Sequence, residues 1–377
     1  MAKGVTLLIK PASGLCNMQC GYCFYADVSE KRKIKNYGIM QPGIQQAMVT
    51  AALRYAEKFC CFAFQGGEPT LAGLDYFKRH VKLQKNYNIR EVRILNTIQT
   101  NGYAINDEWA KFFSDNRFLV GLSLDGPENI HNLFRVDAKG EGTFAKVMHA
   151  AELLTKHRVE FNILTVVNRE VAEHGKDVYE FFKAEGFRYL QFIPCLDDFG
   201  EDGKNVWSLT PKAYGKFLCD VFDCYYADFK RKKPVSVRLF DNYVGMLAGR
   251  PPESCGMSGF CSIYFMVEAD GSVYPCDFYV LDEYRMGNVI LQRFDQIIQS
   301  ENAKQFIRES RHIDDNCRAC KYVNLCRGGC RRNREPFLNG KPGLNRYCSS
   351  LKTFFEHSLG GLKDVAAAVM GNQNRVR

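Results

Sequence analysis

The sequence contains no long apolar run. No uninterrupted apolar stretch approaches the ~20 residues that a membrane-spanning helix requires, and the first four residues, Met1 to Gly4, do not begin an apolar signal segment. We therefore expect a cytoplasmic protein that does not bind membranes. Internal repeats and low-complexity segments are also absent, which argues against a repeat architecture.

Metal-binding histidine patterns and a strong basic excess are missing as well. The seven histidines show no metal-ligand spacing, so we assign none of them a role. The formal net charge of +9 would fall to roughly +4 if cysteine thiolates held three iron–sulfur clusters. Basic runs such as 31–33 and 231–233 are then best interpreted as solvated faces. We expect no nucleic-acid partner.

Cysteine, in contrast, is abundant, with sixteen residues of this type. Thiols stay reduced in the cytoplasm, so this abundance predicts metal ligands rather than disulfides. Three cysteines, Cys16, Cys20 and Cys23, lie near the start, and eight lie between Cys255 and Cys348. The dispersed remainder is interpreted as small buried packing residues: Cys60, Cys61, Cys195, Cys219 and Cys224.

The first three cysteines have the spacing C-x3-C-x2-C. Three thiolates can hold a four-iron cluster and leave its fourth iron without a protein ligand, whereas a cluster that only carries electrons normally has four cysteine ligands. An iron with an open position can bind a substrate. The alternatives are three packing cysteines or a zinc site, but zinc requires a fourth ligand nearby, and no further Cys or His follows until Cys60.

The later cysteines form a second group. Eight thiolates make two complete sets of four. Zinc and iron–sulfur clusters both accept four cysteines, so the spacing alone leaves a pair of zinc ribbons open. The group consists of C-x2-C-x5-C-x3-C at Cys317, Cys320, Cys326 and Cys330, followed by Cys348 and preceded by Cys255, Cys261 and Cys276.

Apolar segments alternate with amphipathic segments over the first two hundred residues. Strands are predicted over 5–9, 60–64, 92–98, 118–124, 159–166 and 187–193. Helices are predicted over 42–58, 71–87, 106–116, 143–157 and 169–185. This order predicts an α/β fold with a parallel sheet. Six units are too few for a closed eight-stranded barrel, so we expect a partial (β/α)6 barrel with its chemistry at the carboxyl ends of the strands.

The sequence pattern changes near residue 250, where a cysteine-rich segment follows a predicted helix over 211–230 and a predicted short strand over 235–239. We expect a barrel domain over 1–250, a cysteine-rich domain with two clusters over 251–349, and a closing helix and tail over 350–377. In the second domain, Asp270-Gly271 predicts a hairpin turn between strands over 263–268 and 272–274.

The first triplet, with Tyr22, Phe24 and Tyr25 around its last cysteine, resembles the radical S-adenosylmethionine (radical SAM) superfamily. The resemblance implies a [4Fe–4S] cluster whose open iron binds S-adenosyl-L-methionine (SAM). The later cysteines resemble the SPASM extension of that superfamily, which implies two auxiliary [4Fe–4S] clusters and three clusters in all. The implied ligand sets are Cys255, Cys261, Cys276 and Cys330 for the first, and Cys317, Cys320, Cys326 and Cys348 for the second.

Further motifs narrow the resemblance to the anaerobic sulfatase-maturating enzymes, and the match spans nearly the whole chain. These motifs are KPAS at 10–13, YGIM at 37–40, QGGEPT at 65–70, QTNG at 99–102, LSLDGP at 122–127 and YPCDFYV at 274–280. The resemblance implies an oxidoreductase that converts a cysteine or serine of an unfolded or nascent sulfatase to Cα-formylglycine without oxygen. It also implies an external one-electron donor similar to flavodoxin or ferredoxin.

Several residues are candidates for contact with SAM. Gly66-Gly67 follows a strand end, where missing side chains let a ligand approach the backbone, and Glu68 offers a carboxylate for an ammonium group. The resemblance completes this set as Tyr22, Gly66, Gly67, Glu68, Ser123, Arg135 and Leu196. Gln65 and Gln99 are candidate substrate contacts, although buried amides that satisfy backbone groups would look the same.

Asp277 is the predicted catalytic base. Oxidation of a thiol or hydroxyl side chain to an aldehyde removes a hydrogen atom from Cβ, a proton from the heteroatom and one more electron. The 5′-deoxyadenosyl radical would take the hydrogen atom, a carboxylate can take the proton, and an auxiliary cluster can take the electron. Asp277 adjoins the predicted ligand Cys276. The alternative is an aspartate that caps a turn.

Two other functions stay open at this level. One is a SPASM-type radical SAM maturase that crosslinks a ribosomal peptide; about fifteen residues before Cys16 leave no room for the leader-binding domain of many such enzymes. The other is a zinc-ribbon scaffold or binding module, which would contain zinc in place of iron and sulfide.

Overall fold

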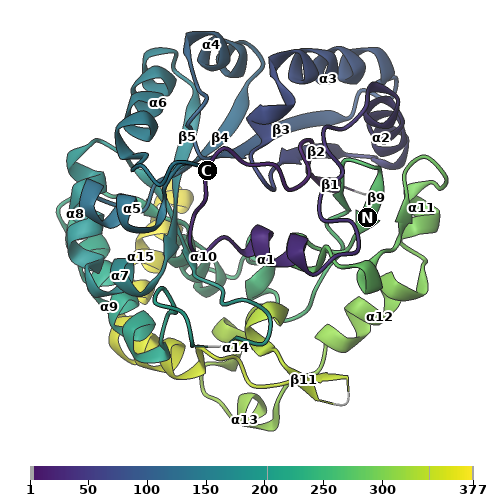
Figure 1. The fold of residues 1–377 in the computed structure, drawn as a ribbon. Coiled ribbons are helices and arrows are strands. Elements are labelled where there is room, and N and C mark those ends of the chain that lie inside the picture. The colour runs from purple at the N-terminus through teal and green to yellow at the C-terminus, as the bar shows by residue number, and fades with distance from the viewer. Residues whose placement is uncertain (1–3, 202, 339, 376–377) are drawn as a thin grey trace. The chain divides into compact units, whose positions relative to one another are not determined.

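The computed structural model describes residues 4–201, 203–338 and 340–375 (Figure 1). The chain forms two compact units, each built from several stretches of sequence. Because the units interleave along the chain, the domain limits expected after residues 250 and 349 stay predictions. Unit 1 contains Met1–Ser123, Asn132–Phe161 and Ser262–Phe306, and unit 2 contains Leu124–His131, Asn162–Cys261 and Ile307–Arg377.

The centre of unit 1 is a parallel sheet. Its strands follow the order β1 (Gly4–Ile9), β2 (Phe59–Phe64), β3 (Arg93–Thr100) and β4 (Phe118–Ser123). Beyond β1 the sheet continues with the short strands β8 (Met266–Val267), β9 (Ser272–Tyr274) and β10 (Gly287–Asn288). Alternate residues of β1 and β2 are buried, as the two-residue period of a strand requires.

Helices connect the strands of unit 1 and lie along the outside of its sheet (Figure 1). They are α2 (Pro42–Tyr55), α3 (Leu74–Tyr87), α4 (Asp107–Asp115) and α6 (Phe144–Lys156). The buried rings of Phe64, Phe77 and Phe118 pack between sheet and helices, with centroids 4.9 and 6.3 Å apart. Burial of each such ring contributes about 1.5–3 kcal/mol. Shorter helices are α1 (Phe24–Glu30), α5 (Glu128–Phe134), α11 (Phe294–Ile297) and α12 (Glu301–Ser310).

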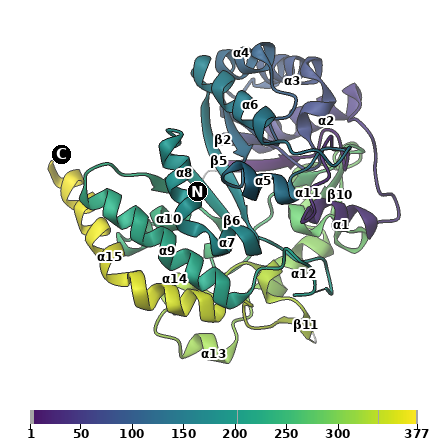
Figure 2. The same ribbon diagram turned by 60° about the vertical axis from the view of Figure 1, so that its left-hand side comes forward.

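Unit 2 contains the parallel strands β6 (Tyr189–Pro194), β7 (Ser236–Val237) and most of β5 (Glu160–Val167). Figure 2 shows the long helices α9 (Pro211–Lys230) and α15 (Cys348–Arg375) side by side. The rings of Phe222 and Phe354 join them at 5.9 Å. The other elements are α7 (Arg169–Glu173), α8 (Gly175–Ala184), α10 (Arg238–Leu247), α13 (Asp315–Arg318), α14 (Val323–Cys326), β11 (Phe337–Leu338) and β12 (Lys341–Pro342).

Most predicted elements are confirmed. Strands β1 to β6 lie within two residues of the predicted limits, and α9 matches its prediction. The helix predicted over 71–87 begins only at Leu74, because Gly73 has a φ of 81° and interrupts the helical backbone. The helix predicted over 169–185 is divided at His174 into α7 and α8.

Two predicted strands are partly wrong. The segment 235–239 is extended only at Ser236–Val237, because α10 begins at Arg238 and turns its apolar side chains inward. Within the segment 263–268 only Met266–Val267 is a strand, although the Tyr264 and Glu268 backbone N–H groups also donate across the hairpin. The hairpin turn at Asp270-Gly271 is confirmed between β8 and β9. Among the described residues, the helices lack the combination of length and apolarity that spanning a membrane requires.

Candidate active site

The cysteine triplet lies on the loop that connects β1 to α1, so it follows the carboxyl end of a strand, as predicted. Cys23 is the N-cap of α1, and its backbone N–H donates to the Cys20 carbonyl oxygen at 3.1 Å. The Cys16 sulfur accepts from the Met18 backbone N–H at 3.4 Å and from the Asn101 side-chain amide at 3.7 Å. Such donors stabilise a thiolate, the form that binds iron. All three cysteines are free of disulfides, and the triplet fits a cluster with three thiolate ligands.

The turn after β2 packs against the loop that carries this triplet. Gly66 and Gly67 have φ values of 77° and 54°. A Cβ on Gly66 would come within 2.5 Å of the Lys10 side chain, and a Cβ on Gly67 within 2.3 Å of the Leu15 carbonyl oxygen. Only glycine satisfies both the backbone conformation and the available space.

Glu68 is 1 % exposed and ties the ends of two strands together. Its carboxylate accepts hydrogen bonds from the Thr70 backbone N–H, the Thr70 and Thr100 hydroxyls and the Asn101 backbone N–H, at 2.7 to 3.0 Å. Burial raises the pKa of Glu68 in spite of these bonds. The side chain therefore has a structural function in the described fold, and its contact with SAM stays a prediction.

Other candidate cofactor residues of unit 1 lie at element ends. The hydroxyl of Ser123, the last residue of β4, accepts from the Gln99 side-chain amide at 3.0 Å. The Arg135 guanidinium lies over the Tyr22 ring, 5.5 Å from its centroid, and its Nη1 is 4.0 Å from the Cys20 sulfur. Arg135 is 6 % exposed, so its guanidinium is buried and does not lie on the surface. A guanidinium at this position can stabilise a thiolate.

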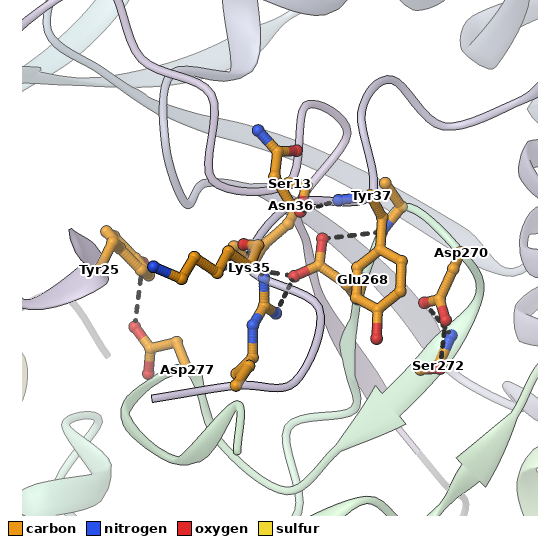
Figure 3. Close-up of polar contacts among 12 residues, drawn as sticks. Ser13, Tyr25, Lys35, Asn36, Tyr37, Glu268, Asp270, Ser272 and Asp277 are labelled. Atoms are coloured by element: carbon orange, nitrogen blue, oxygen red, sulfur yellow. Dashed lines mark hydrogen bonds and ion pairs between the residues drawn. The ribbon is translucent and has the colours of Figure 1, made fainter. Parts of the chain in front are cut away.

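Asp277 lies beside Tyr25 (Figure 3) and also contacts Gln65, so side chains from two other segments of unit 1 meet it. Its Oδ2 accepts from the Tyr25 hydroxyl at 3.3 Å and from the Gln65 side-chain amide at 3.2 Å. Its Oδ1 lies 3.3 Å from the Cys276 sulfur. Desolvation of the carboxylate raises the pKa of Asp277, although the residue as a whole is only half-buried. Asp277 therefore gathers a tyrosine, an amide and a predicted cluster ligand around one carboxylate.

Sequence reasoning missed a buried cluster of charges next to Asp277. The most buried carboxylate of unit 1 among the described residues is Glu268, which accepts from Arg32 at 2.6 Å and lies 3.4 Å from the Lys10 ammonium. Figure 3 shows Glu268 and Tyr25 in the same region, and the Lys10 ammonium lies 5.1 Å from the Tyr25 ring centroid. The sequence does contain a signal for this charge cluster, namely a lysine and a glutamate that each follow an otherwise apolar strand.

In unit 2, one cavity is lined by every cysteine of the second predicted auxiliary set. Cys317 lies on α13, Cys326 ends α14 and Cys348 begins α15, while Cys320 lies between the two short helices. Apolar side chains, among them Leu351, complete the lining. Four free thiols around one cavity fit a four-iron cluster.

The first predicted auxiliary set is divided between the units. Cys255, Cys261 and Cys330 belong to unit 2, and Cys276 follows β9 in unit 1. The segments of Cys255 and Cys330 adjoin, because a Cβ on Gly256 would lie 3.4 Å from the Cys330 Cβ. The set as a whole stays a prediction.

Like the predicted ligands, the five dispersed cysteines are free of disulfides. Cys60 and Cys195 are buried, and burial raises the pKa of both thiols, as expected for packing residues. Cys61, Cys219 and Cys224 are half-buried.

Comparison with known proteins agrees with this arrangement. Residues 11–182 match the radical SAM superfamily, and residues 255–321 match SPASM, an iron–sulfur cluster-binding domain. A radical SAM domain requires a [4Fe–4S] cluster and SAM, and a SPASM domain binds auxiliary clusters. The expected α/β fold with these two domains and the expected cofactors are thus confirmed.

Curated relatives align over almost the full length. The chain is 46 % identical over 373 residues to the cysteine-type anaerobic sulfatase-maturating enzyme of Clostridium novyi, covering 99 % of this chain and 100 % of that protein. It is 48 % identical to the same type of enzyme from Clostridium perfringens, with 96 % and 98 % covered. The serine-type enzyme of Bacteroides thetaiotaomicron is 32 % identical, with 94 % and 90 % covered.

A solved structure, anSMEcpe with bound AdoMet and Cp18Cys peptide, superimposes with a TM-score of 0.94 at 47 % identity, covering 97 % of this chain and 100 % of that one. SuiB of Streptococcus suis shares the fold with a TM-score of 0.64 at 14 % identity. The sulfatase-maturase interpretation is therefore favoured over the peptide-crosslinking enzyme and the zinc scaffold. With its radical SAM and SPASM domains, the chain belongs to the anaerobic sulfatase-maturating enzymes.

Proposed function

We propose that this enzyme oxidises a cysteine, rather than a serine, of an unfolded or nascent sulfatase to Cα-formylglycine. The preference for cysteine is supported by identity: cysteine-type relatives are 46–48 % identical to this chain, and serine-type relatives 29–32 %. The observation that carries the chemistry is the carboxylate of Asp277, held by Tyr25 and Gln65 directly beside Cys276.

The proposed cofactor sites are built from the residues described above. Cys16, Cys20 and Cys23 hold the first cluster. SAM contacts come from Tyr22, Gly66, Gly67, Glu68, Ser123, Arg135 and Leu196, and the auxiliary clusters are held by the two sets of four cysteines. When bound, these groups supply the one-electron chemistry, namely the radical from SAM and an acceptor for the last electron. Iron and sulfide analysis should give about twelve irons with matching sulfide per chain.

Asp277 is proposed to accept the thiol proton of the substrate. Tyr25 and Gln65 fix its Oδ2, which orients the other oxygen. A cysteine that binds iron carries no proton, so in the loaded enzyme Cys276 does not donate to Oδ1, and that oxygen can accept from a substrate thiol. General-base assistance of this kind is worth about 10²–10⁴-fold in rate.

The reaction balances without oxygen. Loss of one hydrogen atom from Cβ, one proton from sulfur and one electron converts the –CH2–SH side chain into a thioaldehyde, –CH=S. Water then replaces sulfur and releases hydrogen sulfide, which leaves the aldehyde of formylglycine. The chain has to provide an acceptor for the proton, and Asp277 fits that task by position.

The test is anaerobic incubation of the reconstituted enzyme with SAM, a reductant and a sulfatase-motif peptide that contains cysteine. A second peptide that differs only by serine at the target is the matched control. Mass spectrometry should show aldehyde and 5′-deoxyadenosine with the first peptide and at least several-fold less with the second. A crosslinked peptide, or equal rates on both peptides, would contradict the proposal.

We further propose a cytoplasmic location and an external electron donor of the flavodoxin or ferredoxin class. A reduced protein of either class should replace the chemical reductant in the assay above. Failure of both to support turnover, with the chemical reductant active, would exclude them.

A further inference from the structure

Leu196, a proposed SAM contact, lies in a short segment directly after β6. Its neighbours Cys195 and Asp197 are 2 % exposed, and Leu196 itself is half-buried. The Cys195 backbone N–H donates to the Val167 carbonyl oxygen at 2.9 Å, so the segment continues the sheet beyond the end of β6. Ligands of parallel sheets bind at the carboxyl ends of the strands, which is where this segment lies. The backbone of the segment fixes the position of Leu196.

Side chains from the cysteine-rich part of unit 2 hold both ends of this segment. The Tyr347 hydroxyl donates to the Cys195 carbonyl oxygen at 3.1 Å. At the other end, Arg332 donates to the Asp197 carbonyl oxygen at 2.7 Å, and Arg346 donates to the Asp197 carboxylate at 2.6 Å. The backbone on either side of Leu196 is therefore fixed by residues more than 130 positions away in sequence.

The same turn also holds a proposed cluster ligand. Asn345 accepts the Tyr347 backbone N–H on its side-chain oxygen and the Cys348 backbone N–H on its carbonyl oxygen, both at 2.8 Å. Its side-chain amide donates to the Gly328 carbonyl oxygen at 3.1 Å, between Cys326 and Cys330. The turn 345–348 thus contains Cys348 and contacts both the loop between Cys326 and Cys330 and the Leu196 segment.

The ion pair in this connection is buried and charged. The Asp197 carboxylate also accepts from the Ser208 hydroxyl and from the Gly203 backbone N–H. Burial alone would raise the pKa of Asp197, but the hydrogen bonds from Ser208, Gly203 and Arg346 outweigh it and lower the pKa. The Arg346 side chain is 20 % exposed and that of Asp197 1 %. Removing one partner of such a pair leaves a poorly solvated charge, so the ion pair ties the two segments together.

We propose that Arg346 and Tyr347 are positioning residues that couple the second auxiliary cysteine set to SAM binding. Iron bound by Cys348 fixes the turn that carries them, and they fix the Leu196 segment. A chain with that set loaded should bind SAM more tightly than a chain with the set empty, and SAM should in turn slow the loss of iron from the set, because coupling is reciprocal. The proposal rests on the proposed function in two respects only: the assignment of the second auxiliary cysteine set as cluster ligands, and the contact of Leu196 with SAM.

The experiment is a double-mutant cycle on SAM affinity. Wild type, Arg346→Gln, Cys317→Ala and the double variant are reconstituted anaerobically, their iron is counted, and SAM binding is measured by equilibrium dialysis. Each single variant should weaken SAM binding about fivefold. The double variant should be no weaker than either single variant, because both changes interrupt one connection. Arg231→Gln, which changes an exposed arginine paired with the buried Asp228 of unit 2, is the matched control and should bind SAM like wild type.

A purely structural function of the ion pair predicts additive effects. Wild-type affinity in Arg346→Gln, or a double variant weakened about 25-fold, would overturn the proposal. Arg346→Lys keeps the cation and should recover most of the affinity. If the arginine variants do not fold, Tyr347→Phe keeps the ring and removes one O–H donor, and should weaken SAM binding about threefold.

A second measurement needs no variant. Iron release from the wild-type enzyme to a chelator is followed over time, with and without SAM. The kinetic phase of iron release that is missing in Cys317→Ala is assigned to the second auxiliary cysteine set. SAM should slow that phase about fivefold, and an unchanged phase would contradict the coupling. Peptide oxidation is scored separately: aldehyde without coupling overturns this inference alone, whereas coupling without aldehyde overturns the proposed function alone.

Discussion

Two carboxylates of unit 1 share a chemistry and differ in their surroundings. Glu68 and Asp277 each follow a strand end, and burial raises the pKa of both. The Glu68 oxygens accept from donors in Thr70, Thr100 and Asn101 and so close the turn on the neighbouring strand. Asp277 is held through one oxygen and keeps the other beside Cys276. A carboxylate that accepts from backbone and side-chain donors at both oxygens stabilises a fold, whereas one held at a single oxygen can exchange a proton.

The largest expected effect is at Asp277. Asp277→Asn keeps the size and hydrogen-bonding capacity of the side chain but removes the proton acceptor, so aldehyde formation should fall about 10²–10⁴-fold while SAM cleavage continues. Product and 5′-deoxyadenosine are measured in one assay by mass spectrometry. Asp282→Asn is the control, because Asp282 is exposed and, like Asp277, follows β9 in the sequence. Aldehyde at the wild-type rate in Asp277→Asn would remove Asp277 from the mechanism.

At Glu68 we expect a loss of stability instead. In Glu68→Gln the side-chain NH2 would face the Asn101 backbone N–H, so that two hydrogen-bond donors meet without an acceptor. The free energy of unfolding should fall by about 1–3 kcal/mol. Thermal unfolding of the reconstituted enzyme should shift downward, and SAM cleavage and aldehyde should decline together. An unshifted melting temperature with selective loss of aldehyde would show that Glu68 acts as a reactive group, like Asp277.

The smallest effect is expected at Tyr25. Tyr25→Phe removes one hydrogen bond to Asp277 and keeps the ring that packs beside Phe24 at 4.0 Å. Aldehyde formation should slow about tenfold, in keeping with one hydrogen bond to a charged group, with SAM cleavage retained. Tyr189→Phe changes an exposed tyrosine of unit 2 and is the control. A Tyr25→Phe enzyme as slow as Asp277→Asn would mean that the tyrosine, not the aspartate, carries the proton.

The sequence was sufficient for the parts of the molecule that depend on local pattern. The apolar runs of β1 to β6 identify strands because each is buried by its neighbours, and the cysteine spacing identifies a cluster site because ligands of one iron group must lie close together. The same reasoning located Gly66 and Gly67, whose left-handed backbone leaves no room for a side chain.

The contacts that span the chain could not be read in this way. The ion pairs of Lys10 and Arg32 with Glu268 join positions more than 230 residues apart, and neither partner carries a local signal for the other. Two of the four hydrogen bonds that give Glu68 a structural function come from Thr100 and Asn101, at the end of the adjacent strand. The strand expected beyond Val237 failed because an amphipathic helix and a short apolar strand look alike over five residues.

Gly66 makes the turn after β2 intolerant of redesign in one specific respect. The stem of Lys10 passes through the space that a Cβ on this glycine would fill, so even a methyl group there would push the Lys10 ammonium away from Glu268. A mutant library should keep both glycines fixed, and it should keep Gln65 as well, because its side-chain amide donates to Asp277.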